Sequence, residues 1–137
     1  GLAGNLGEIA GKLSNGVMVF QTYTWMGKLE PRADAIWKKI QAKYGLKTPE
    51  QIRMGSAVAN SYDAVYIIAQ AIEKAGSFDR AKVREAMYQV RYDGLVAKYD
   101  PAFERTQERH DAILPKYYKL TAWHEGKLLP LAETPYK

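Results

Sequence analysis

Two histidines are the first candidates for chemistry, because each is followed directly by a carboxylate. His110 precedes Asp111, and His124 precedes Glu125. A histidine beside an acid can act as a general base, but a hydrolase also needs a nucleophile, and a metal site needs a second ligand. The sequence has no cysteine and no GxSxG, HExxH or P-loop motif. We therefore expect both pairs to be solvated loop residues, and the protein to be no enzyme and to need no cofactor.

Aromatic and small polar residues form the second group of candidates. Tyr23 and Trp25 lie where an expected strand ends, a common position for ligand contacts in open α/β sheets. Asn60, Ser61 and Tyr62 lie near the beginning of a long expected helix, where unpaired backbone N–H groups can hold a carboxylate. These five residues are the candidate ligand contacts. The alternative is structural: the aromatic pair packs a helix onto the sheet, and Asn60 or Ser61 only caps the helix.

The charge pattern does not favour a nucleic-acid partner. The chain of 137 residues carries 20 Lys and Arg against 15 Asp and Glu, a formal net charge of +5. A nucleic-acid binder normally gathers its basic residues on one face, often around exposed aromatic rings. Here the basic residues are spread along the chain with acids nearby, as on solvated helix faces. We expect no nucleic-acid partner, and the apolar runs are too short for a membrane-spanning helix.

Hydrophobic periodicity predicts four helices, which run over residues 6–13, 31–44, about 56 or 60 to 75, and from 80 onward. Pro31 suits the first position of the second helix, and Gly45 and Gly76 suit helix ends. Thr48 to Gln51 has the form of a capping box, after which Gly55 is expected to break the helical pattern. Asp79 is the expected cap of the fourth helix.

Runs of β-branched and aromatic residues predict short strands. The expected strands are 16–24, which should be largely buried, then 95–99, 117–123 and 128–131. The turn 124–127 contains a glycine and should join the last two strands in a hairpin. The charged, proline-bounded segment 100–115 is expected to be a long loop.

One part of the long helix lacks the alternation of a surface helix. From Ala64 to Ala69 six apolar residues follow one another without a polar break. A helix that is apolar on most sides needs cover on more than one face. Cover could come from another part of the same protein, from a second copy, or from exchange of elements between copies. A dimer should bury Val65, Ile68 and Ile72.

The order of the motifs resembles the leucine/isoleucine/valine-binding family of periplasmic solute-binding proteins of ABC transporters. The resemblance rests on EIAGKLSNGVMVFQTY, then AKYG, SYDAVYIIAQAIEKAGSFDRAKVREAM, YDGLVAKYDP and the final YYKLTAWHEGKLLPL. Its most specific part is the YDAV helix that runs into AGS, from Tyr62 to Ser77. The matched motifs cover nearly the whole chain and correspond to the C-terminal third of such a protein.

The resemblance implies an α/β protein, helix-rich with a few short strands and a C-terminal hairpin, as a C-terminal fragment of a type I periplasmic-binding-protein fold. Proteins of that family have two lobes that close on a small solute in the periplasm and deliver it to a membrane permease. Residues 1–24 and 100–137 would belong to the hinge and the second lobe, and residues 25–99 to the first. The opening GLAGNLGEIAG also reads as the middle of a longer or processed protein.

Roles carry over from the family one position at a time. Tyr62 matches a family tyrosine that lines the cleft, and Tyr23 and Trp25 match a crossover segment that reaches the ligand in some members. The acid that holds the ligand's ammonium in amino-acid-binding members would lie just ahead of EIAG, and residues 1–7 contain no acid. The ligand therefore stays open between an amino acid, an amide, an aromatic acid and another small carboxylate. A self-associating helical module, as a homodimer or domain-swapped oligomer without a small-molecule ligand, is the alternative.

Overall fold

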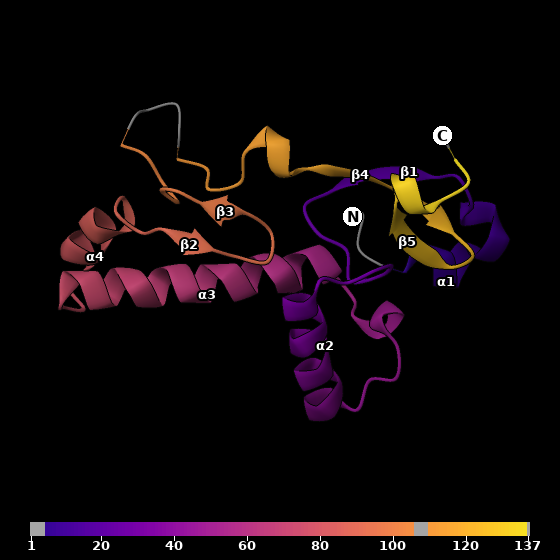
Figure 1. The fold of residues 1–137 in the computed structure, drawn as a ribbon, viewed down its shortest axis with the longest axis horizontal. Coiled ribbons are helices and arrows are strands. Elements are labelled where there is room, and N and C mark those ends of the chain that lie inside the picture. Colours follow the sequence, from indigo (N-terminus) through magenta and orange to yellow (C-terminus); the bar gives the residue numbers. More distant parts are fainter. Residues whose placement is uncertain (1–4, 106–109, 137) are drawn as a thin grey trace. The chain divides into compact units, whose positions relative to one another are not determined.

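The computed structural model describes residues 5–105 and 110–136 (Figure 1). The chain divides into two compact units. The first contains residues 1–58 and 118–137, and the second contains residues 59–117. The opening four residues and residues 106–109 of the expected long loop lie outside the described part.

A three-stranded antiparallel sheet organises the first unit. Its strands are β1 (Met18–Gln21), β4 (Lys119–His124) and β5 (Lys127–Pro130), with β4 in the middle. The predicted hairpin is confirmed, because β4 and β5 are joined by a two-residue turn. Both turn residues, Glu125 and Gly126, have positive φ angles of 48° and 78°, as a type I′ turn requires.

The prediction of a long, largely buried first strand is wrong. Strand β1 has four residues and lies at an edge of the sheet. Only Val19 is buried in it, whereas the side chains of Met18 and Phe20 are 51% and 65% exposed. The apolar stripe of the preceding helix is exposed too: α1 (Leu6–Ala10) and the 3₁₀ turn Gly11–Ser14 leave Ile9 and Leu13 in solvent.

Helix α2 (Pro31–Tyr44) has the predicted bounds. Pro31 is its first residue, and Gly45 ends it in the left-handed conformation with φ 67°. The helix buries Ala33, Ile36 and Trp37, but Tyr44 at its end is exposed. The capping box at Thr48 is also confirmed, on the short 3₁₀ helix Pro49–Gln51.

Helix α3 (Gly55–Ala75) runs from the first unit into the second. Gly55 does not break the helical pattern but is the first residue of the helix, because Met54 before it takes the turn with φ 58°. The predicted C-terminal cap is confirmed at Gly76, with φ 56°. Helix α4 (Arg80–Met87) is capped as predicted by Asp79, whose side chain accepts the backbone N–H of Lys82 at 3.0 Å.

The apolar run in α3 has one covered and one exposed face. Ala59, Asp63, Ile67 and Ala71 recur every fourth residue and are buried. On other faces, Val65 and Ile68 are 65% and 46% exposed. Within the part of the chain that the structure describes, other residues therefore cover only one face of α3.

The second unit also contains a two-stranded hairpin of β2 (Tyr92–Asp93) and β3 (Lys98–Tyr99). The predicted strand 95–99 is wrong for its first half. Residues 94–97 form the hairpin turn, in which the Gly94 N–H donates to the Ala97 carbonyl oxygen at 2.9 Å.

Candidate functional site

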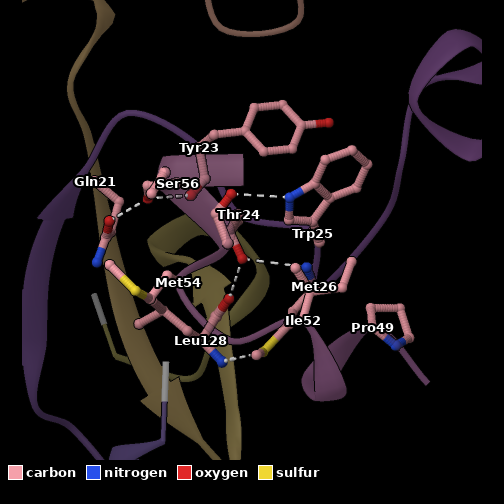
Figure 2. A pocket seen from close by; sticks show the side chains of 12 residues that line it. Gln21, Tyr23, Thr24, Trp25, Met26, Pro49, Ile52, Met54, Ser56 and Leu128 are labelled. Carbon is pink, nitrogen blue, oxygen red and sulfur yellow. Dashed lines mark hydrogen bonds between the residues drawn. The ribbon is translucent and has the colours of Figure 1, made fainter. Parts of the chain in front are cut away.

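The first unit contains a pocket of about 190 Å³ (Figure 2). Three segments form its wall: the chain that leaves β1, the chain from Pro49 into the first turn of α3, and Leu128 of β5. Most of the lining is apolar or aromatic. The lining residues are Gln21, Tyr23, Thr24, Trp25, Met26, Pro49, Ile52, Met54, Gly55, Ser56, Ala57 and Leu128.

Tyr23 and Trp25, predicted as ligand contacts, both line this pocket. Their rings meet edge to face with centroids 5.1 Å apart. Trp25 is 2% exposed, and its indole N–H donates to the Gly55 carbonyl oxygen at 2.9 Å. Trp25 therefore anchors the beginning of α3, as the structural alternative proposed. Tyr23 is half-buried and extends along the pocket (Figure 2).

Side-chain hydroxyls hold the wall in place. Ser56 Oγ donates to the Tyr23 carbonyl oxygen at 2.8 Å and lies against the side-chain amide of Gln21. Thr24 Oγ1 donates to the Leu128 carbonyl oxygen at 2.7 Å. These bonds cross between distant parts of the chain, so the pocket is preformed by the fold (Figure 2).

The first turn of α3 adds backbone N–H groups to the polar part of the lining, which also includes the side chains of Gln21 and Thr24. The first helical bond runs from the Val58 N–H to the Met54 carbonyl oxygen at 3.1 Å. The N–H groups of residues 55–57 therefore precede the helical hydrogen-bond ladder, and all three residues line the pocket. The positive end of a helix dipole favours a negatively charged group there.

An ion pair ties the segment before α3 to the sheet. Lys127 Nζ lies 3.5 Å from Glu50 Oε1. Burial by itself would raise the pKa of Glu50. Hydrogen bonds from the Thr48 side chain and from the backbone, together with the charge of Lys127, outweigh burial and lower that pKa. The carboxylate therefore stays ionised beside the pocket.

Asn60, Ser61 and Tyr62 lie elsewhere, in the second unit. Of the two expected helix starts, 56 and 60, the structure is close to the first: α3 begins five residues before Asn60, so the N–H groups of these three residues lie inside the helix and not in its unpaired first turn. Asn60 lines a different, apolar pocket of about 200 Å³, Ser61 is exposed, and Tyr62 packs on Tyr66. Their role as ligand contacts stays a prediction.

Sequence reasoning missed Ser56 and Met54 as pocket residues. The sequence allowed the long helix to start at residue 56 or at residue 60. The earlier start would have placed Ser56 at the beginning of the helix, where a pocket residue could be expected. Gln21 and Thr24 were concealed inside a segment expected to be buried strand. Their pocket position follows from β1 ending at Gln21.

One of the two histidines, His124, has other surroundings than the sequence suggested. His124 is the last residue of β4, and its Nδ1 lies 3.1 Å from the Tyr136 hydroxyl. Its neighbour Glu125 instead bonds with Asn15, which accepts the Glu125 N–H at 2.9 Å. His110 is exposed. Across residues 5–105 and 110–136, His, Asp and Glu form no group of three or more that could hold a metal ion.

Residues 2–119 match the family model described as periplasmic binding protein. The chain belongs to this family. No curated protein sequence matches it at a significant level. The match covers the whole second unit and every residue that lines the pocket except Leu128.

Solved structures of the same family share the fold. The type 1 periplasmic binding protein of Bordetella pertussis Tohama I is 26% identical over 90% of this chain, with a TM-score of 0.67. The leucine binding protein LivK of Thermotoga maritima is 23% identical over 90%, with a TM-score of 0.64. A solute binding protein of an ABC transporter from R. palustris, in complex with 4-hydroxybenzoate, is 17% identical over 94%, with a TM-score of 0.61.

The chain spans about a third of the length of these structures, 35%, 32% and 33% respectively. Its fold is thus part of a type I periplasmic binding protein, helix-rich with short strands, as predicted. Proteins of this family bind solutes and are not enzymes. None of the helices in the described part is long and apolar enough to cross a membrane.

Proposed function

We propose that this chain is part of the substrate-binding component of an ABC transporter. The transporter takes up a small solute, which is an amino acid or a related small carboxylate or amide. The observation that carries the proposal is the preformed aromatic pocket within a chain of the periplasmic binding protein family. Ligand pockets are mostly apolar, with a few polar groups that fix orientation. This pocket has that composition.

The pocket's chemistry supports a small amphipathic solute. Trp25, Met26 and Ile52 offer apolar surface, and the first turn of α3 offers N–H groups that suit a carboxylate. A volume of about 190 Å³ is below the range for drug-sized ligands. Related structures include a leucine binding protein and a 4-hydroxybenzoate complex. An amino acid and an aromatic acid are therefore the two ligand classes to test.

The same proposal includes the cellular setting. The chain works in the periplasm as the C-terminal part of a larger protein, and the partner that receives the solute is a membrane permease. Further ligand contacts come from Tyr62, which resembles a cleft tyrosine of the family, and from its neighbours Asn60 and Ser61. Support for these points comes from the family membership and from relatives about three times as long.

A thermal-shift screen tests the proposal. The chain is heated with leucine, valine, an amide series, benzoate or 4-hydroxybenzoate, and any longer product of the same reading frame is screened beside it. A ligand at about a hundred times its Kd stabilises the native state by about 2.7 kcal/mol. A hit should be lost in Tyr23→Ala and kept in Tyr44→Ala, which removes an exposed tyrosine of the same unit. If none of these compounds raises the melting temperature of the chain or of the longer product, the proposal is contradicted.

The exposed face of α3 favours a second candidate, self-association. Val65, Tyr66 and Ile68 are 65%, 45% and 46% exposed, and two alanines of the same helix, Ala64 and Ala69, are exposed as well. A second copy that covers this face would make a dimer. Sedimentation should then show an oligomer that Val65→Lys converts to a monomer. A monomer at high concentration in the unchanged chain contradicts this candidate.

A further inference from the structure

The pocket of the first unit has an uncharged, mostly apolar wall (Figure 2). All twelve described residues that line it have side chains that are uncharged at neutral pH. Trp25, Met26 and Ile52 supply apolar surface and are 2%, 8% and 6% exposed. A solute that enters this pocket leaves water for apolar surroundings, so a charged group of the solute then needs a partner in the lining.

Two backbone carbonyl groups of the lining already accept hydrogen bonds from side chains. The Tyr23 carbonyl oxygen accepts the Ser56 hydroxyl hydrogen at 2.8 Å. The Gly55 carbonyl oxygen accepts the Trp25 indole N–H at 2.9 Å. Both oxygens therefore have a hydrogen-bond donor from within the protein.

The polar atoms of Thr24 and Met26 are occupied in the same way. Thr24 Oγ1 donates to the Leu128 carbonyl oxygen at 2.7 Å and accepts the Met26 N–H at 3.2 Å. The Met26 sulfur accepts the Leu128 N–H at 3.0 Å. An ammonium group has three hydrogen-bond donors and no acceptor. It would therefore need the acceptors that this lining already uses for its own bonds.

Glu50 is the acid that follows the lining residue Pro49 in the chain, and it has a cation as its partner. Its carboxylate oxygen lies 3.5 Å from Lys127 Nζ in the same unit. Glu50 and Lys127 together form a neutral pair beside the pocket. Such a pair offers little net attraction to a second cation.

We propose that the pocket takes a small organic acid with an apolar body and without an ammonium group, and discriminates against the α-amino acid of the same size. This inference rests on the proposed function and narrows its ligand class. The cost of an unpartnered ammonium in apolar surroundings falls on the amino acid alone. The acid of the same carbon skeleton offers the same apolar body and the same carboxylate without that cost.

Two matched pairs of probes test this discrimination by calorimetric titration at neutral pH. The acid 4-methylpentanoate is leucine without its amino group, and 3-phenylpropionate is phenylalanine without its amino group. In a pair that binds the chain or a longer product of its reading frame, we expect the acid to bind at least tenfold more tightly than the amino acid. A smaller preference, or a preference for the amino acid, overturns the inference while the proposed function stands.

A carboxylate added to the wall should remove the discrimination. Met54 lines the pocket and is 57% exposed. Its φ of 58° is left-handed, a conformation that aspartate and asparagine adopt more readily than methionine. Met54→Asp should therefore fold, and Met54→Asn is its control of the same shape without the charge. We expect Met54→Asp to lower the ratio of acid affinity to amino-acid affinity about tenfold or more relative to Met54→Asn.

Equal affinity ratios in these two variants overturn the assignment of the discrimination to this pocket. If Met54→Asp does not fold, Ala57→Glu replaces it, with Ala57→Gln as control. Ala57 is an exposed lining residue in the first turn of α3, where an acid is favourable. The same tenfold criterion then decides. If none of the four probes binds the chain or its longer product, the proposed function fails for these solutes, and the inference fails with it.

Discussion

The buried carboxylate of Asp63 gives the sharpest prediction on stability. Asp63→Asn replaces one carboxylate oxygen by an NH₂ group, so at least one backbone donor, of Leu95 or Val96, faces another donor. Both N–H groups now bond to a carboxylate oxygen, Leu95 to Oδ1 at 2.7 Å and Val96 to Oδ2 at 2.8 Å. Hydrogen bonds to charged groups contribute about 1.5–3 kcal/mol each, and an unpaired buried donor costs about 1–3 kcal/mol. We expect a loss of about 2–4 kcal/mol from the unfolding free energy of the second unit.

Urea unfolding followed by tyrosine near-UV circular dichroism measures this loss. All three tryptophans lie in the first unit, so their fluorescence reports that unit separately. Hydrogen exchange should quicken at the amides of Leu95 and Val96. The matched control is Asp111→Asn, which removes the same charge from an exposed residue. An Asp63→Asn stability within about 0.5 kcal/mol of that control would refute the reasoning.

Three further predictions concern single contacts. Gly94→Ala should destabilise the second unit by about 1–3 kcal/mol, because a Cβ there would lie 2.7 Å from the Tyr99 ring; an unchanged urea midpoint would contradict this. Trp25→Phe should cost the first unit about 1–3 kcal/mol through the lost bond to the Gly55 carbonyl and a smaller ring, as seen by fluorescence of the other tryptophans. Glu50→Gln should lower the melting temperature at neutral pH by an amount worth at most about 1 kcal/mol. Because the folded-state pKa of Glu50 is lowered, its contribution is present above the unfolded pKa of about 4.5 and is lost in acid, so the two melting curves should converge there.

Elements bounded by residues with strong local preferences were predictable from the sequence. Pro31 and Gly45 fix the ends of α2, because proline suits the first helical position and glycine adopts the left-handed conformation at the end. The Thr48 capping box and the β4–β5 hairpin were found for the same reason. In each case the deciding interaction joins residues that are close in sequence.

Errors arose where the deciding contact is distant in sequence. Phe20 has the residue type of a buried strand but is exposed, because β1 lies at the edge of the sheet, where β4, about a hundred residues later, pairs with it on one side only. The beginning of α3 was uncertain because Met54 has an unusual positive φ for a residue that is not glycine.

The candidate site was predictable in part. Tyr23 and Trp25 were correctly predicted to lie together after the first strand, and both line the pocket. The prediction was possible because binding sites in open α/β sheets commonly lie where strands end. The roles of Ser56 and Leu128 depend on bonds across the unit that no local pattern reveals. The stacking of the Tyr66 ring on Tyr92 was also not predictable, because Tyr92 belongs to a two-residue strand that no local pattern indicates.

The most direct test of the central claim is a calorimetric titration of the chain, and of any longer product of its reading frame, with leucine and with 4-hydroxybenzoate. The account predicts saturable binding of one of these solutes at a single site, lost in Tyr23→Ala and retained in Tyr44→Ala. Saturable binding that Tyr23→Ala leaves unchanged would contradict the assignment of the pocket. If neither solute gives a saturable heat of binding, with the chain or with its longer product, the protein does not bind these solutes and the central claim is contradicted.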